Sequence, residues 1–219
     1  MKTKSKFLTV FGYVIMAAVL LWLIISGATA LIKNGSASPD DAQKGDVCEF
    51  TAFFADEAFE VKNTINFIPT GKEHYYLAMS EDGIVRFLVR AKPSWIDKNF
   101  PLSGFSESGG VKIKGRIVSM DYKLIQEAKD INNVLLRSET ITEEESLNVY
   151  YYIDARYKEF GGLRLLCGAG IVVIGVLSFL GSRNGMLQSN NAVKIVFGVA
   201  AVGIALLTLY TLTVGGTGI

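Results

Sequence analysis

The sequence predicts a membrane α-helical protein that also carries an extramembrane α+β domain. All 21 acidic residues lie between Asp40 and Glu159, and both flanks of the chain carry only basic charge. Those flanks contain three long runs without any charged residue, at positions 7–32, 165–182 and 195–219. With a rise of about 1.5 Å per residue, such runs have the length that a helix needs to cross a hydrocarbon core of about 30 Å. We therefore expect three transmembrane helices and one polar domain.

These features divide the chain into three parts. We expect residues 1–32 to form a cytoplasmic tip and transmembrane helix 1, and residues 33–160 to form an extracytoplasmic α+β domain. Residues 161–219 should form transmembrane helices 2 and 3, joined by a short cytoplasmic loop at positions 181–194.

The orientation follows from the basic residues near the ends of the helices. Cytoplasmic segments of membrane proteins carry an excess of lysine and arginine. The N-terminal tip has Lys2, Lys4 and Lys6, and the short loop has Arg183 and Lys194 without an acid. We therefore expect a multi-pass protein of the cell membrane with a cytoplasmic N-terminus and its main domain outside.

The first helix has a competing interpretation as a cleaved secretory signal. Its basic tip, apolar run and the small residues Ala28-Thr29-Ala30 resemble a signal with a cleavage site. The apolar core is longer than that of an ordinary signal and includes Trp22. We therefore expect this helix to be retained as an anchor.

The first half of the domain shows one ambiguous segment and one clear hairpin. Residues 47–61 are rich in phenylalanine, and their spacing fits either a helix or a strand, of which we favour the strand. Residues 73–80 and 84–90 are rich in strand-forming side chains, and Asp82-Gly83 lies between them. An Asp-Gly pair between two such runs is a strong signal for a β-hairpin.

The second half alternates short helices and strands. Residues 93–100 should turn helically, and the alternation in residues 111–117 predicts a half-buried strand. Asp121 can cap a helix that runs to about Arg137, and residues 147–155 should form the last strand. We expect about five strands and one main helix. An OB-like barrel, small and partly closed, is one arrangement that fits this composition.

Two segments of the domain resemble those of an uncharacterised bacterial integral-membrane protein family. They are Gly71-Lys72-Glu73-His74-Tyr75-Tyr76 with the hairpin that follows, and Val111-Lys112-Ile113-Lys114-Gly115-Arg116-Ile117. The resemblance implies one N-terminal helix, an extracytoplasmic domain and a C-terminal helical hairpin. It implies no activity and no functional residues.

The residue inventory argues against several kinds of chemistry. His74 is the single histidine, so neither a two-histidine metal site nor a catalytic set with a second histidine can form. Cys48 and Cys167 lack metal-type spacing, and we expect both to be buried thiols. The domain holds 16 basic and 21 acidic residues, and its net charge of −5 disfavours nucleic acid as a partner. We expect no catalytic residue, no metal and no cofactor.

Three groups of residues are candidates for contacts. If their strands pair, the basic side chains near positions 86–92 and 112–116 could form one face for an acidic or phosphate-bearing partner, although ordinary solvent exposure explains them better. Small residues along the last two helices let helices approach closely. Tyrosine and basic residues collect at bilayer interfaces. The candidates for helix packing or docking are Gly168, Gly175, Ser182, Ala201 and Ala205, and those for headgroup contact are Tyr150, Tyr152, Arg156, Tyr157 and Lys158.

The absence of acids from the apolar runs argues against an ion-coupled pump, which needs ionisable groups inside the membrane. We therefore expect a non-catalytic binding, sensing or assembly module, an accessory subunit whose partners are the lipid bilayer and another membrane protein. A hydrolase or transferase at the outer membrane surface, with carboxylates that the sequence does not single out, is the alternative.

Overall fold

A computed structural model describes residues 2–183 and 191–213, except 34, 36, 40, 66–67, 82, 84–85, 102–103, 107–108, 139 and 144–145. The chain divides into two compact units. One comprises Met1–Ile32 with Lys158–Ile219, and the other is Lys33–Tyr157. The predicted combination of long apolar helices with a mixed helix-and-sheet domain is confirmed.

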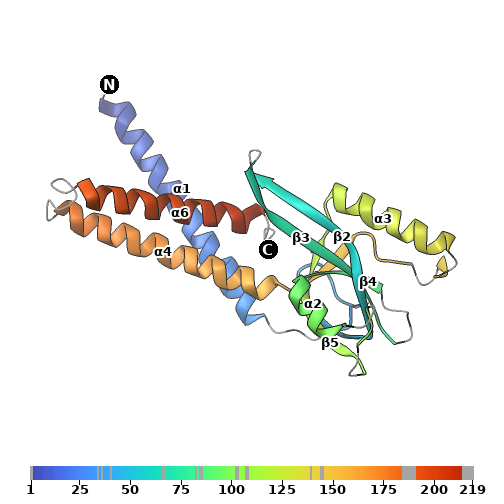
Figure 1. Ribbon diagram of the computed structural model, residues 1–219. Coiled ribbons are helices and arrows are strands. Elements are labelled where there is room, and N and C mark those ends of the chain that lie inside the picture. The colour runs from blue at the N-terminus through green and yellow to red at the C-terminus, as the bar shows by residue number, and fades with distance from the viewer. Residues whose placement is uncertain are drawn as a thin grey trace. The chain divides into compact units, whose positions relative to one another are not determined.

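Within its described residues, the second unit contains one six-stranded sheet and the helices α2 and α3. The strands follow the order β1-β5-β6-β4-β3-β2, and the pair β4–β6 alone is parallel. The elements are β1 (Val47–Ala52), β2 (Phe54–Ile65), β3 (Ile68–Met79), β4 (Arg86–Ala91), α2 (Pro93–Asn99), β5 (Val111–Ser119), α3 (Tyr122–Arg137) and β6 (Tyr151–Asp154) (Figure 1).

The two outermost strands of this order are consecutive in the chain. Phe53 alone separates β1 from β2, and β1 pairs with β5 whereas β2 pairs with β3. If β1 and β2 are counted as one bent strand, the sheet begins and ends on the same strand and therefore closes on itself. The ambiguous segment at 47–61 is thus strand, and it accounts for the sixth strand beyond the five predicted.

The sheet has an apolar core on each face, because successive side chains of a strand point to opposite sides. The core on the inner face includes Val89, Ile113 and Ile153, together with Ile96 from α2. The other core includes Leu88 and Tyr152 together with Leu124 and Ala128 from α3. Helix α3 therefore covers the outer face of the sheet.

Two local predictions are confirmed in this unit. The Asp121 side chain accepts a hydrogen bond of 2.9 Å from the backbone N–H of Leu124, so it caps α3 as expected. Strands β3 and β4 form the predicted antiparallel hairpin, and Gly83 between them has a φ of 69°. A positive φ is accessible to glycine at little steric cost. Asp82 lies outside the described residues.

The helical unit consists of α1 (Lys2–Ile32), α4 (Tyr157–Arg183) and α6 (Asn191–Thr213). By length and composition, three helices in the described part of the chain could cross a membrane, over Val14–Ile32, Tyr157–Gly181 and Asn191–Leu212. Each is apolar around most of its circumference, as membrane-spanning helices are.

Candidate functional site

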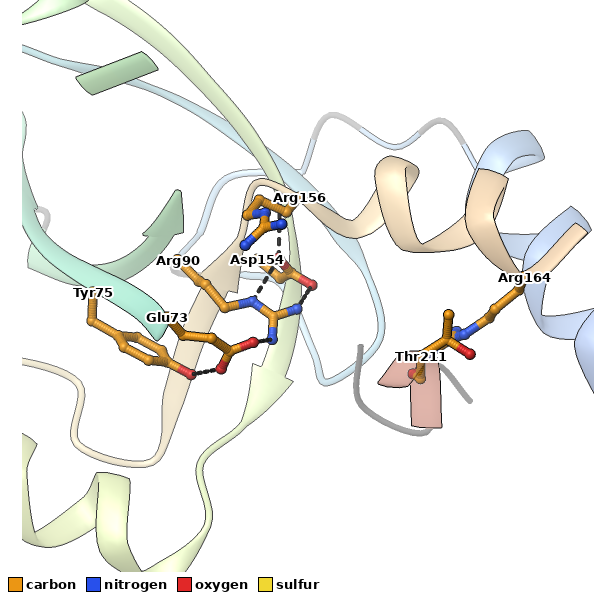
Figure 2. A network of polar contacts seen from close by, with 7 residues as sticks. All are labelled: Glu73, Tyr75, Arg90, Asp154, Arg156, Arg164 and Thr211. Atoms are coloured by element: carbon orange, nitrogen blue, oxygen red, sulfur yellow. Dashed lines mark hydrogen bonds and ion pairs between the residues drawn. The ribbon is translucent and has the colours of Figure 1, made fainter. Parts of the chain in front are cut away.

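A buried group of charged side chains lies on the outer face of the sheet, where β4 and β6 end. Arg90 pairs in register with Asp154 across β4–β6 and with Tyr75 across β3–β4. Its Nε donates to Asp154 Oδ1 at 3.0 Å, and its Nη2 donates to the other carboxylate oxygen of Asp154. Its Nη1 donates to Glu73 Oε1 at 2.9 Å. One guanidinium therefore binds both carboxylates (Figure 2).

Aromatic rings surround this ion cluster. The Tyr75 hydroxyl donates to Glu73 Oε2 at 3.2 Å, and the Arg90 guanidinium lies 5.7 Å from the centroid of the Tyr152 ring. Tyr75 contacts Tyr152 edge-on at 5.3 Å and stacks on Phe59 at 5.0 Å between centroids. The rings exclude water from the charges, and the contact of a cation with a ring face is attractive.

The electrostatics of the cluster reflect its burial. Glu73, Arg90 and Asp154 are 6, 2 and 2 % exposed. Burial by itself would lower the pKa of Arg90, but the charge of Asp154, with Tyr152 and Glu73, raises it above its ordinary value. Burial raises the pKa of Tyr152 to about 12. Both carboxylates are held by a permanent cation, which fits a structural ion cluster better than a general acid or base.

The cluster lies close to the residues that hold both connections to the helical unit. The backbone N–H of Arg156, just before α4, donates to Asp154 Oδ1 at 3.0 Å. Arg116 pairs in register with Asp154, and its Nε donates to the carbonyl oxygen of Gly45 at 3.2 Å. The same carbonyl accepts a 2.7 Å hydrogen bond from Lys33 Nζ, directly after α1. Strands β5 and β6 thus hold the domain side of both connections.

Exposed tyrosines gather where β5 ends and β6 begins. Tyr122, Tyr150 and Tyr151 are 79, 59 and 37 % exposed. The backbone N–H of Met120 donates to the Tyr150 carbonyl at 2.8 Å, and Tyr151 pairs with Ser119, so all three lie near the start of α3. We call these three residues the tyrosine patch. Sequence reasoning singled out Tyr150 but missed the patch, because Tyr122 is distant in the chain from the other two.

The predicted headgroup contacts are corrected in part. Tyr152 is 5 % exposed and packs in the core beneath α3, because it alternates with the exposed Tyr151 along β6. Tyr157 is also 5 % exposed. Contact with headgroups is therefore wrong for these two side chains. Tyr150 is exposed but lies at the other end of β6 from Arg156 and Lys158, which stay candidates.

The small residues predicted for helix packing or docking also differ in their surroundings, since only some of them face another helix. A Cβ added at Gly168 would lie 3.4 Å from Ile24 of α1, so this position does face a helix. Among the described residues, a Cβ at Gly175 would meet nothing within 4 Å, and Ala201 and Ala205 are exposed. Of the two roles predicted for these positions, packing or docking, the exposed surroundings fit docking better, and that role stays a prediction. The side chain of Ser182 lies outside the described residues.

The closest contact between helices lies elsewhere. A Cβ added at Gly161 of α4 would be 2.7 Å from Ala30 Cβ of α1, and one added at Gly27 would be 2.9 Å from the Gly161 carbonyl oxygen. Further along, Gly170 of α4 faces Ile204 of α6 at 2.6 Å. Glycine at these positions lets the helix backbones approach closely.

A polar layer also lies inside the helical unit. Arg164 of α4 is 2 % exposed, and its Nη2 donates to the Thr211 carbonyl of α6 at 3.4 Å (Figure 2 labels both residues). The Arg164 guanidinium also lies 5.0 Å from the centroid of the Trp22 ring of α1. Arg164 therefore contacts both other helices of this unit.

The remaining sequence candidates are engaged in local pairs. His74 Nδ1 lies 2.8 Å from Glu57 Oε1. Lys112 and Lys114 both approach Glu49. Strand β6 lies between β4 and β5, so the direct strand pairing on which a common basic face was predicted to depend does not occur.

Cys48 is fully buried, and burial raises the pKa of its thiol to about 11. In the part of the chain that the structure describes, no group of three His, Cys, Asp or Glu side chains is placed to hold a metal ion.

Comparison of the chain with protein-family models, with curated proteins and with solved structures found no match. The resemblance to a bacterial membrane-protein family therefore stays a prediction, and the function has to be inferred from the residues themselves.

Proposed function

We propose that this chain is a membrane-anchored, extracytoplasmic binding or assembly module, and that it acts as an accessory subunit of a membrane complex. In this proposal α1, α4 and α6 span the bilayer and hold a barrel of the OB type outside the cytoplasm. A single closed sheet of five strands, with β1 and β2 counted as one, supports the barrel.

The observation that carries the proposal is the tyrosine patch. Tyrosine is enriched in protein–protein interfaces, because its ring gives a large contact area at low entropic cost and its hydroxyl can still form a hydrogen bond. The Asn148 side-chain oxygen accepts hydrogen bonds of 3.0 Å from the backbone N–H groups of both Tyr150 and Tyr151. These bonds fix the backbone of the patch, which lowers the entropic cost of binding.

The surface that OB barrels commonly use for oligonucleotides and oligosaccharides is covered here. Those ligands bind on the face of the second and third strands. The corresponding strands are β3 and β4, whose side chains Leu77 and Leu88 pack in the same core as Leu124 of α3. This cover, together with the net negative charge, favours a protein partner over a nucleic acid.

The alternative of a hydrolase or transferase finds less support. Such an enzyme would need a carboxylate available for proton transfer or attack. The two buried carboxylates, Glu73 and Asp154, are instead both bound by Arg90.

The test is photocrosslinking in native membranes, with a photoreactive phenylalanine analogue in place of Tyr150. We expect a discrete crosslinked band that contains a second membrane protein. The double variant Tyr122→Ser with Tyr151→Ser should remove the band. Val134→Ser is the matched control, because Val134 is 64 % exposed on α3 but lies away from the patch. A band that survives the double variant, or no band at all, would contradict the proposal.

A further inference from the structure

Helices α1 and α4 are longer than a bilayer requires. They have 31 and 27 residues, which correspond to about 46 and 40 Å at a rise of about 1.5 Å per residue. A hydrocarbon core is about 30 Å thick, and tilt can shorten the projection of a helix across it. Length alone therefore does not decide which part of each helix lies in lipid, and the charges and contacts of the helices have to be considered.

The charges of α4 match the two boundaries of one hydrocarbon core. Residues 165–182 are uncharged, and Arg164 and Arg183 enclose them. These 18 residues correspond to about 27 Å, which is close to the thickness of the core. An arginine near the centre of the bilayer is costly, whereas one near the end of a span can reach the headgroups. Because α4 follows the sheet unit in the chain, Arg164 then marks the boundary on the domain side.

The contacts of Arg164 extend this level to the other two helices. Its guanidinium lies 5.0 Å from the centroid of the Trp22 ring of α1, and its Nη2 donates to the Thr211 carbonyl of α6 at 3.4 Å. Ser26, one turn after Trp22, and Thr208, one turn before Thr211, are also buried. All three helices thus contribute polar groups near one level. We call these five residues the polar layer.

The chemistry of the polar layer fits the interface of a bilayer better than its centre. Tryptophan and tyrosine are enriched where the hydrocarbon meets the headgroups. Trp22 is part of the layer, and Tyr210, next to Thr211, contacts Phe160 of α4 at 6.3 Å between ring centroids. A charged guanidinium and buried hydroxyls would both be costly in the middle of the hydrocarbon.

Hydropathy alone favours a different placement of α1. The candidate span Val14–Ile32 has its midpoint near Leu23, so the neighbouring Trp22 and the guanidinium beside it would lie close to the centre of the bilayer. Residues 7–13, which are also uncharged, would then lie outside the hydrocarbon on the cytoplasmic side. The two placements therefore differ in which end of α1 leaves the lipid.

We propose that the polar layer lies in the headgroup region on the domain side, with interfacial lipid as its partner. The inference rests on the proposed insertion of α1, α4 and α6. The hydrocarbon core then covers residues 7–22 of α1 and 165–182 of α4. The three N-terminal lysines follow at the opposite boundary, where basic residues are expected on the cytoplasmic side.

The remaining part of α1 has a different role in this arrangement. Residues 23–32 correspond to about 15 Å of helix beyond Trp22. They pair with the first turns of α4, where a Cβ added at Gly27 would lie 2.9 Å from the Gly161 carbonyl oxygen. These two helical segments form a stem that leads from the hydrocarbon through the headgroups to the domain.

The test compares two positions on one face of α1. Val14 and Ile25 are 60 and 61 % exposed, and they are eleven residues, or about three turns, apart. Nitroxide labels are attached to Val14→Cys and to Ile25→Cys in the full chain, in nanodiscs of phosphatidylcholine. Selective labelling is feasible, because Cys48 and Cys167 are both buried.

Power saturation gives the accessibility of each label to oxygen and to a water-soluble nickel chelate. The ratio of the two reports depth, because packing against protein lowers both. We expect the oxygen-to-chelate ratio at position 14 to be at least about threefold that at position 25, since only position 14 lies deep in the hydrocarbon. Val173→Cys is the reference, because Val173 is exposed at the middle of residues 165–182. Its ratio should match that at position 14.

A higher ratio at position 25 than at position 14 would overturn the inference and support the placement of Val14–Ile32 in the core. Equal ratios would also overturn it, because the polar layer would then lie within the hydrocarbon. A chain that does not enter nanodiscs would contradict the proposed function. A chain that enters them with the deeper label at position 25 would contradict only the level assigned to the polar layer.

Discussion

At the scale of single residues, the domain depends on one buried cation. Arg90 is separated from Glu73 by 17 positions and from Asp154 by 64 positions in the chain. A buried ion cluster of this kind is costly to desolvate, and removal of one partner leaves an uncompensated charge. Arg90 and its carboxylates should therefore be sensitive to substitutions that preserve shape but remove charge.

We expect Asp154→Asn to destabilise the protein by about 3–5 kcal/mol, because Arg90 loses its bidentate partner in a site closed to water. Chemical unfolding of the purified chain in detergent, followed by tyrosine fluorescence, measures this loss. The control is Glu60→Gln, which removes an exposed partner of Lys72 at 3.0 Å and should leave the midpoint unchanged. Similar midpoints for Asp154→Asn and the parent would show that the cluster contributes little.

Tyr152, beside this cluster, should make the stability of the folded protein decrease at alkaline pH. Burial raises the pKa of Tyr152 from 10.0 to about 12. Because the folded state disfavours the phenolate, the stability that neutral Tyr152 provides is fully present below pH 10 and declines as pH rises toward about 12. Unfolding midpoints measured from pH 9 to 12 should fall, and Tyr152→Phe should reduce the slope. If Tyr152→Phe leaves the pH dependence of the unfolding midpoint unchanged, other groups cause the loss of stability at alkaline pH.

At the scale of elements, helix packing is decided by a few close approaches. The glycines at positions 161, 168 and 175 follow a seven-residue spacing, but an ideal α-helix drifts by about 20° over each such interval. Contact with α1 is accordingly tightest at Gly161, looser at Gly168 and absent among the described neighbours of Gly175. A regular spacing in sequence therefore does not ensure a continuous contact between two straight helices.

We expect Gly161→Leu to lower the thermal midpoint in detergent by several degrees, because its side chain would collide with Ala30. Gly175→Leu is the matched control, with open space around the added atoms, and should leave the midpoint unchanged. Scanning fluorimetry of the three proteins makes the comparison. Loss of stability in Gly175→Leu alone would place the helix contact at position 175 after all.

At the scale of the whole molecule, the connections to the helical unit are fixed at the level of Asp154, and the tyrosine patch lies where β6 begins. The patch is therefore separate from the residues that hold these connections, as a surface that recognises a partner should be. The proposal depends on which side of the membrane the domain occupies.

For the topology, we expect reporters that are active only outside the cytoplasm to work when fused after Lys44 and to fail when fused after Asn184. The reason is the excess of basic residues at the N-terminal tip and in the loop at 181–194. A cytoplasmic reporter should give the complementary result at the same two positions. The reverse pattern would place the domain in the cytoplasm and contradict the proposed function.

Sequence reasoning alone predicted the features that depend on neighbours in the chain. These include the three long apolar helices, the hairpin around Gly83 and the Asp121 cap of α3. Each of them follows from local periodicity, from turn chemistry or from one side chain that binds a nearby backbone group.

Only the tertiary structure decided the features that depend on distant pairings. The parallel contact of β4 with β6 brings Arg90 to Asp154, and the alternation along β6 buries Tyr152 while it exposes Tyr151. A shift of one residue in any of these pairings would move each side chain to the other face, and no local pattern specifies the pairing between distant strands.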